Sequence, residues 1–267
     1  MTVREEQLFE FDTRGVVVIR GALSPGEVDE LNRALDLVQP APPPVAFPLL
    51  DLGPLCVELM ARAATLELLR SLIGDYLRFD HGLGIQMTAD TAVGENLHGG
   101  PRSHQGSEHY QWVHGGMYNG LVVAMYVLAD VNDGDGGFIC VPGSHRANTP
   151  YRPPLDSPLV VNPAVRAGDM IVFTEALIHG TRQWRAEHRR RALVYKYAPG
   201  YLVANPYDSL APYRELATTP LQRELLGPAG SSMRARLSVF TDALGPAGDP
   251  GLDPRAQPAR SNGVYAR

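Results

Sequence analysis

The segment Arg166-Ala-Gly-Asp-Met-Ile-Val-Phe-Thr-Glu-Ala-Leu-Ile-His179-Gly180 indicates the fold of this chain. Within it, Gly168-Asp169 is typical of a turn, and the apolar run 170–173 predicts a buried strand. The segment then delivers His179 at the end of a second apolar stretch, directly before a glycine. A strand end that carries a histidine into the mouth of a barrel is the arrangement of jelly-roll metal sites. We therefore expect His179 to bind a metal ion.

Short strand-like runs surround this segment, separated by Gly, Pro, Asp and Asn turns. They cover residues 76–79, 83–87, 121–128, 137–141, 159–161 and 192–198. Many short strands with such turns are typical of a sandwich or barrel. Residues 88–120 form a long His- and Gly-rich stretch, and a loop of that length inside a domain is usually functional. We expect a mainly β chain with flanking helices.

The N-terminal part of the chain predicts helices. A short helix is expected over residues 5–12, and the β-branched run 15–19 predicts a strand. Ser24-Pro25-Gly26-Glu27 has the pattern of a capping box, and the apolar spacing that follows predicts a helix of about four turns. Residues 55–73 predict another helix, which Gly74 would end.

We expect one domain over residues 1–244. It would comprise a helical N-terminal third (1–75), a jelly-roll core (76–200) and a C-terminal helical segment (201–244), in which residues 208–226 hold one or two short helices. Residues 245–267 are rich in Pro, Gly, Ala and Arg, which predicts a loose tail.

Composition excludes several classes of protein. The chain has 267 residues, of which 44% are hydrophobic and 20% charged, an ordinary globular mixture. Its net charge of −5 argues against a nucleic-acid or acidic-membrane partner. Its basic residues are 23 Arg and a single Lys, a skew that we interpret as genome composition. Two cysteines cannot form a disulfide framework, and no apolar leader or membrane span is present, so we expect a cytoplasmic protein with a small-molecule partner.

Further along the chain, several motifs resemble those of the phytanoyl-CoA dioxygenase family, a branch of the Fe(II)/2-oxoglutarate-dependent oxygenases. The likeness covers most of residues 8–200. The resemblance implies a double-stranded β-helix (jelly roll, cupin-like) and an iron site made of a His-x-Asp motif and a distal His, with open positions for 2-oxoglutarate and O2. The motifs that carry it are Gly136-Gly-Phe-Ile-Cys-Val-Pro-Gly-Ser-His145, Ala167-Gly-Asp-Met-Ile-Val-Phe173, His179-Gly-Thr181, Arg190-Arg-Ala-Leu193 and the opening segment 11–28.

The same resemblance implies roles for particular residues. His179 would be the distal iron ligand. Arg190, eleven residues later, falls where the family places the arginine that grips the C5 carboxylate of 2-oxoglutarate, a role that suits a bidentate guanidinium. Arg191 is the fallback, because the run 189–191 is all arginine and neighbouring strand residues point to opposite faces. Thr181 would assist with the same carboxylate.

The chain departs from the family at the proximal motif. In Leu97-His98-Gly99-Gly100, His98 fits the first ligand, but Gly100 stands where the carboxylate is expected. Three explanations are open. Another carboxylate reaches the metal, with Glu108 as the leading candidate; or a halide fills the gap, as in some halogenases of the superfamily; or the site is degenerate and does not turn over.

Four residues are expected to contact the substrate: His104, His109, Trp112 and His145. His145 is as well suited to ordering the turn in which it lies. The polar loop suits a hydrogen-bonding, anionic or glycosidic small molecule. We expect oxidation of a C–H bond, with hydroxylation as the leading outcome, in a metabolite that would fit secondary metabolism. The alternatives are a halogenase that uses the gap at Gly100, and a non-catalytic cupin-like binding protein.

Overall fold

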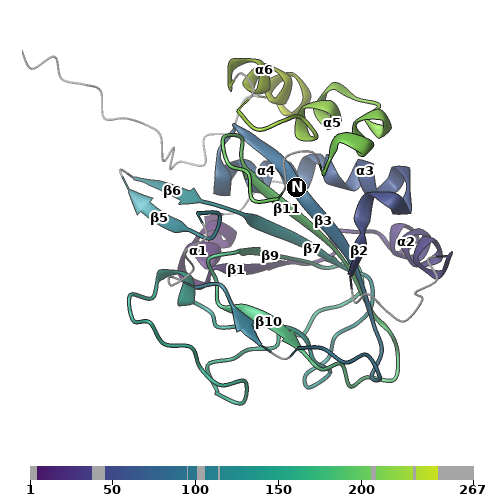
Figure 1. Cartoon of the computed structure of the whole chain (residues 1–267), viewed down its shortest axis with the longest axis vertical. Helices are drawn as coiled ribbons and strands as arrows, with labels where there is room; N and C mark the ends of the chain where they lie inside the picture. The colour runs from purple at the N-terminus through teal and green to yellow at the C-terminus, as the bar shows by residue number, and fades with distance from the viewer. Residues whose placement is uncertain are drawn as a thin grey trace, which may run out of the picture.

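Two antiparallel sheets form the middle of the molecule. The larger has six strands in the order β1-β9-β7-β11-β3-β2, and the smaller has three in the order β4-β10-β8. A separate hairpin, β5-β6, projects from one side (Figure 1). The prediction of a mainly β, jelly-roll fold with flanking helices is confirmed.

The computed structural model describes residues 5–37, 46–94, 96–100, 106–113, 115–205, 209–230 and 233–245. The predicted tail therefore lies, beyond residue 245, outside the described residues. The elements are α1 (Glu5–Arg14), β1 (Val16–Ile19), α2 (Pro25–Leu37), β2 (Ala46–Pro48), η1 (Leu49–Leu52), α3 (Pro54–Met60), α4 (Ala63–Ile73), β3 (Leu77–Met87), β4 (Leu97–His98), β5 (Tyr110–Val113), β6 (Gly116–Asn119), β7 (Val122–Val127), β8 (Gly137–Cys140), η2 (Ser144–Arg146), β9 (Met170–Thr174), β10 (His179–Arg182), β11 (Arg190–Pro199), η3 (Ala211–Leu216), α5 (Pro220–Leu225) and α6 (Met233–Leu244).

The large sheet separates two hydrophobic cores. Strand β7 shows how: its residues 122, 124 and 126 pack in the core that the helices share, whereas 123, 125 and 127 pack in the core between the sheets. This follows from the two-residue period of a strand. Helices α3 to α6 lie on one side of the large sheet, and β10 with its neighbours lies on the other (Figure 1). The second core is therefore the interior of the jelly roll.

Strand β11 brings two basic side chains to this interior. Its residues Leu193, Tyr195 and Tyr197 belong to the helix-side core, and Ala192 and Val194 belong to the inner core. Because the pattern alternates, positions 190 and 196 share the inner face. Six residues of strand separate positions 190 and 196 by about 20 Å. Arg190 and Lys196 therefore lie toward opposite ends of the interior of the jelly roll.

The capping box is confirmed at the start of α2. The Ser24 backbone N–H donates to Glu27 Oε2 at 2.8 Å, and the Glu27 N–H donates to Ser24 Oγ at 3.4 Å. Glu27 also pairs with Arg62. The single helix expected over 55–73 is in fact two helices, α3 and α4. The pairing with Glu27 is made by a residue in the break between them. Arg62 is extended between them (φ −62°, ψ 120°), and its guanidinium donates to the carbonyl of Ala22 at 2.9 Å.

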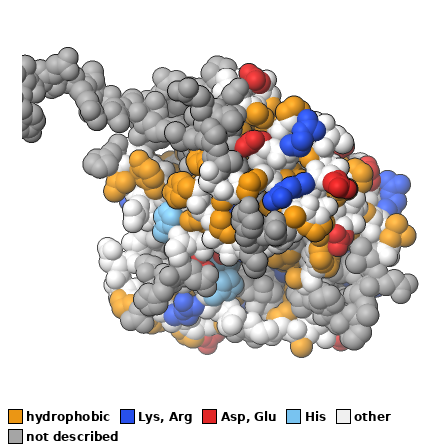
Figure 2. Space-filling model, turned by 45° about the horizontal axis from the view of Figure 1, so that its top comes forward, with side chains coloured by type: hydrophobic (Ala, Val, Ile, Leu, Met, Phe, Trp, Pro, Cys, Tyr) orange, Lys and Arg blue, Asp and Glu red, His pale blue; other side chains and the backbone are white. Residues whose placement is uncertain are grey.

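Other local expectations differ in detail. The runs 76–79 and 83–87 form one continuous strand, β3, and residues 159–161 contribute only a single bridge, from Val161 to Cys140. The stretch 88–120 contains three short strands, β4, β5 and β6. Within the described ranges, none of the helices is both long and apolar enough to cross a bilayer. Figure 2 shows acidic and basic side chains interspersed on one face of the molecule.

Candidate active site

Three side chains with metal-binding atoms meet at the small sheet. One ligand atom from each of His98, Glu175 and His179 lies within 4.8 Å of the others. His98 and His179 are directly paired across β4 and β10, and their ring centroids are 4.2 Å apart. Glu175 precedes His179 by four residues, immediately after β9. Two imidazoles and one carboxylate match the ligand set of non-haem Fe(II) oxygenases.

The protonation state of His179 suits metal binding. Its Nδ1 lies 2.7 Å from the carbonyl oxygen of Leu177, so Nδ1 carries the proton and donates it to that oxygen. The lone pair of Nε2 is therefore available, and Nε2 lies 3.8 Å from Glu175 Oε2. Burial lowers the pKa of His179 to about 4. His98 is exposed at the end of β4, and partial desolvation by the neighbouring protein atoms lowers its pKa as well. Both imidazoles are neutral at pH 7.

Glu175 is the charged member of the cluster. Its side chain is 5% exposed, and its Oε1 lies 2.6 Å from Nζ of Lys196. Burial alone would raise the pKa of Glu175, but the positive charge of Lys196 outweighs burial and holds the pKa below its usual value. The site therefore contains an ionised carboxylate.

The geometry at Gly99 and Gly100 explains why the carboxylate does not follow His98. Both glycines have positive φ, +74° and +87°. A Cβ at position 100 would lie 2.6 Å from Cγ1 of Ile178, and a Cβ at position 99 would lie 2.4 Å from the carbonyl oxygen of Leu177. Ile178 belongs to an apolar cluster with Leu97. A side chain at position 100 would therefore enter that cluster.

Sequence reasoning missed Glu175, although it stands four residues from His179 in the segment that indicated the fold. Glu108, the expected candidate, does not join the three-residue cluster. It is half-buried, and its charge acts on the neighbouring His98. The β4 segment that carries His98 is held by Arg152, which donates to the carbonyls of Leu97 and, at 3.0 Å, Gly99.

Arg190 lies in the interior, at the deep end of β11. Its exposure is 4%, and its nearest polar contacts are sulfurs: Nη1 lies 3.1 Å from Met87 Sδ, and Nη2 lies 4.0 Å from Met125 Sδ. Burial lowers its pKa to about 10. Among the described residues, no carboxylate pairs with it. Because a buried charge without a partner is costly, this guanidinium is suited to receive an anionic ligand.

A small cavity next to Arg190 is walled by Val131, Phe138 and Ile171 among other apolar residues. Gly137 leaves room for the Arg190 side chain, since a Cβ at position 137 would lie 2.7 Å from Arg190 Nε. Thr181 on β10 is paired with Phe138 on β8. It lies on the same face of β10 as His179, two residues earlier.

Arg191, the second candidate for binding the C5 carboxylate of 2-oxoglutarate, faces the other way. It donates to Asn32 Oδ1 at 3.1 Å and pairs with Asp36, both on α2. Its guanidinium joins α2 to the outer face of the large sheet, so the two arginines occupy opposite faces of β11.

The four predicted substrate residues have different surroundings. His104 lies outside the described residues. His109 is half-buried, with Nδ1 2.8 Å from the carbonyl oxygen of Gly106, and Trp112 is 48% exposed on β5. His145 is buried, and its Nε2 lies 3.0 Å from the carbonyl oxygen of Asp12 at the end of α1. That contact joins the turn that carries His145 to α1.

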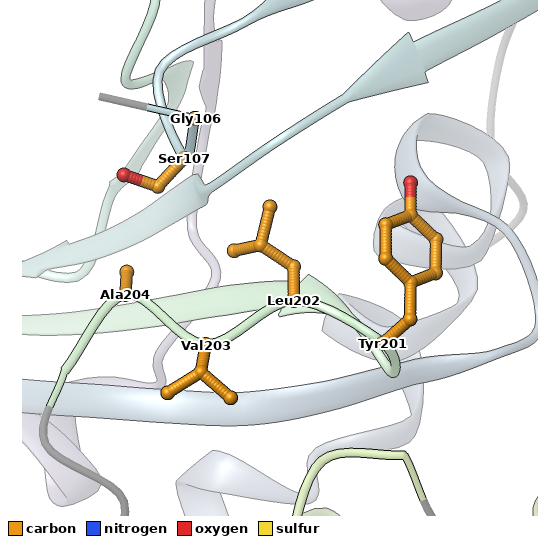
Figure 3. A pocket seen from close by; sticks show the side chains of 6 residues that line it. All are labelled: Gly106, Ser107, Tyr201, Leu202, Val203 and Ala204. Atoms are coloured by element: carbon orange, nitrogen blue, oxygen red, sulfur yellow. The ribbon is translucent and has the colours of Figure 1, made fainter. Parts of the chain in front are cut away.

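An open groove of about 440 Å³ is formed by two segments (Figure 3). One wall is Gly106-Ser107 and the other is the segment 201–204 that follows β11. Asp80 fixes the second wall by accepting from the backbone N–H of Ala204 at 3.2 Å. The first wall is connected to the metal cluster through one residue, because Leu121 donates to the Ser107 carbonyl and accepts from the Glu175 N–H.

Solved structures of similar proteins contain a metal ion, and two of those named here also contain 2-oxoglutarate. HygX from Streptomyces hygroscopicus, solved with nickel and 2-oxoglutarate bound, is 31% identical over 76% of this chain and 89% of its own, with a TM-score of 0.67. HygX with nickel, 2-oxoglutarate and hygromycin B bound is 30% identical over 75% of this chain and 89% of its own, with a TM-score of 0.68. EctD from S. alaskensis with bound Fe shares the fold at 19% identity, over 74% of this chain and 77% of its own, with a TM-score of 0.60.

No curated protein matches the chain. Residues 44–192, more than half of the chain, match the family of phytanoyl-CoA dioxygenase (PhyH). The chain therefore belongs to the phytanoyl-CoA dioxygenase family and is a 2-oxoglutarate-dependent non-haem iron dioxygenase.

Proposed function

We propose that this enzyme oxidises a C–H bond of a small glycosidic metabolite, with iron held by His98, Glu175 and His179. The observation that carries the proposal is the meeting of two histidines and one glutamate, whose ligand atoms lie within 4.8 Å of one another. This donor set fits Fe(II), for which two histidines and one carboxylate form a facial triad with open positions. When bound, iron supplies the redox chemistry that couples reduction of oxygen to oxidation of 2-oxoglutarate and of the substrate.

Residues of the chain prepare the donors for that role. The Leu177 carbonyl fixes the His179 tautomer, so that Nε2 offers its lone pair without losing a proton. Arg152 holds the backbone on both sides of His98. Glu175 supplies the negative charge that retains a divalent cation before the co-substrate arrives.

Arg190 is proposed to bind the C5 carboxylate of 2-oxoglutarate, and Thr181 to donate a hydroxyl hydrogen bond to it. The support is a buried guanidinium beside a small cavity, paired with no acidic side chain in the part of the chain that the structure describes. Its surroundings of Met87, Met125 and Phe138 exclude water, which strengthens a charge-assisted pair. Arg191 is engaged by α2 and is not proposed for this role.

The substrate class rests on the groove and on a relative. HygX binds hygromycin B in one solved structure. In this chain the groove offers the Ser107 hydroxyl on one wall and the exposed ring of Tyr201 on the other (Figure 3). A hydroxyl and an aromatic platform suit the polar edge and apolar face of a sugar ring. We propose His109 and Trp112, which follow on the same loop and hairpin, as further contacts.

Glu175 favours oxygenation over halide transfer. With a carboxylate supplied by Glu175, the ligand set is complete and the glycine at position 100 leaves no ligand missing. The halide alternative requires that no carboxylate occupies the position that the halide would take. We also propose a reducing, cytoplasmic setting, because Cys56 and Cys140 are both free and buried.

Two alanine variants test the ligand set, with purification in the absence of oxygen. Glu175→Ala is expected to lose bound iron and to stop succinate formation, because the only carboxylate of the cluster is gone. Glu108→Ala is the matched control, a half-buried glutamate on the neighbouring loop, and it is expected to keep its iron. Iron loss in Glu108→Ala with retention in Glu175→Ala would assign the third ligand to Glu108 instead.

A further inference from the structure

We propose that Lys196 is a positioning residue that makes Glu175 bind iron through one oxygen. The inference rests on the proposed function, in which Glu175 is an iron ligand. The two oxygens of Glu175 have different neighbours: Oε1 lies 2.6 Å from Lys196 Nζ, and Oε2 lies 3.8 Å from His179 Nε2. The ammonium therefore occupies one oxygen and leaves the oxygen that faces the histidines.

Glu175 is buried and Lys196 is half-buried. The side chain of Glu175 is 5% exposed and that of Lys196 is 19% exposed. In such surroundings an ion pair is only weakly screened by salt, so the orientation of the carboxylate is set by this contact. A carboxylate without this ion pair would be free to rotate about its last side-chain bond.

The choice of lysine at this position is unusual for this chain. Every other basic residue of the sequence, 23 in number, is arginine. The remaining described ion pairs use arginine or histidine as the cation. A guanidinium donates through a planar fork that takes both oxygens of a carboxylate, whereas an ammonium is a point donor that can take one. A lysine at position 196 thus leaves Oε2 free where an arginine would engage both.

The backbone places Lys196 at an irregularity of the sheet. On β11 it pairs with His81, while the next residue, Tyr197, pairs with Phe79, so Asp80 is the extra residue of a bulge. Bulges re-aim neighbouring side chains and are frequent next to active sites. Asp80 is itself held by Arg78, at 2.6 Å. The position of the Lys196 backbone is therefore fixed on the inner face.

The number of oxygens that Glu175 gives to the metal matters for the reaction. A carboxylate bound through one oxygen leaves one more open position than a carboxylate bound through both. The 2-oxoglutarate co-substrate needs two open positions, and oxygen needs a further one. By restraining Oε1, Lys196 keeps the position that the second co-substrate requires.

Two substitutions should shift metal binding in opposite directions. Lys196→Met frees Oε1 and removes a like charge, so cobalt(II) alone should bind on the order of 10-fold more tightly. Lys196→Arg keeps the charge but engages both oxygens, so cobalt(II) should bind on the order of 10-fold more weakly. Lys196→Gln replaces the methionine variant if that variant does not fold.

The measurement is a cobalt(II) titration of the full chain without 2-oxoglutarate, followed by the cobalt absorption spectrum. Arg166→Met, which removes an exposed cation paired with Asp130, is the control and should match wild type. Opposite shifts in affinity and a changed spectrum in Lys196→Met support the proposal. Wild-type behaviour of both lysine variants, or equal weakening of both as general packing damage would give, overturns it.

Glu175→Gln, titrated in parallel, separates the two levels of the argument. If it binds cobalt(II) as wild type does, Glu175 is not a ligand and the proposed ligand set fails. If it loses binding while the lysine variants behave as wild type, the ligand set stands and only the role of Lys196 fails.

Discussion

Glu175 Oε2 and His179 Nε2 lie 3.8 Å apart, and both residues come from the short segment that runs from the end of β9 to the first residue of β10. The expected proximal motif would instead place the carboxylate two residues after His98. In this chain that position is Gly100, and the negative charge comes from Glu175, in the segment that leads into β10, the strand that pairs with β4. The ligand types are therefore those of the expected motif, two histidines and one carboxylate, but the carboxylate comes from a different place in the sequence.

Introducing the expected carboxylate at position 100 should not improve the site. Gly100→Asp puts a side chain at a positive φ and into contact with Ile178, so both iron affinity and stability should fall. The backbone strain alone is worth about 1–2 kcal/mol. Gly100→Ala is the control for strain without charge, and thermal unfolding with an iron titration measures both effects. Tighter iron binding by Gly100→Asp would contradict the geometry described here.

The two arginines of β11 should separate cleanly in co-substrate binding. Arg190→Ala leaves the C5 carboxylate of 2-oxoglutarate without its charged partner, at a cost of about 2–5 kcal/mol. Arg191→Ala removes only contacts to α2, so it should leave the affinity for 2-oxoglutarate near wild type. A 2-oxoglutarate titration of the metal-loaded protein measures both, and the reverse ranking would transfer the role to Arg191.

The pairing of Glu27 with Arg62 should make stability depend on pH. The hydrogen bond from Arg62 lowers the pKa of Glu27 to about 2 in the folded protein, below its usual value of 4.5. The pair therefore stabilises the fold above pH 4.5, and this contribution is lost as the pH falls from 4.5 toward 2. Glu27→Gln should flatten the stability profile in that window, as measured by urea unfolding. An unchanged slope would mean that the pair does not form.

Metal removal should leave the protein folded. In the absence of a cation, Lys196 still compensates the charge of Glu175, and both imidazoles are neutral. Chelation is therefore expected to lower the melting temperature without abolishing cooperative unfolding, and iron should restore it by mass action. Glu175→Ala should show no response to iron. A chelated wild-type protein without a cooperative transition would contradict this expectation.

Features that depend on local periodicity could be predicted from the sequence. The strands β7, β9 and β11 and the capping box at Ser24 arise from neighbouring residues, and the structure has them. The break between α3 and α4 could not be predicted, because it involves Arg62 and Glu27, which are 35 positions apart.

The ligand set shows the same limit. His179 was predicted from its own segment, but β4 has only two residues, too few for a pattern to reveal that His98 pairs with it. Glu175 was missed because nothing local marks an acidic residue as inward-facing. Its orientation depends on Lys196, which lies on another strand.

The most direct test of the ligand set is a crystal structure of the complex with Fe(II) and 2-oxoglutarate, grown without oxygen. We predict iron bonded to His98, to Nε2 of His179 and to one oxygen of Glu175, with the C5 carboxylate of 2-oxoglutarate on Arg190. Iron bonded to Glu108, or to a halide with Glu175 turned away, would contradict the account.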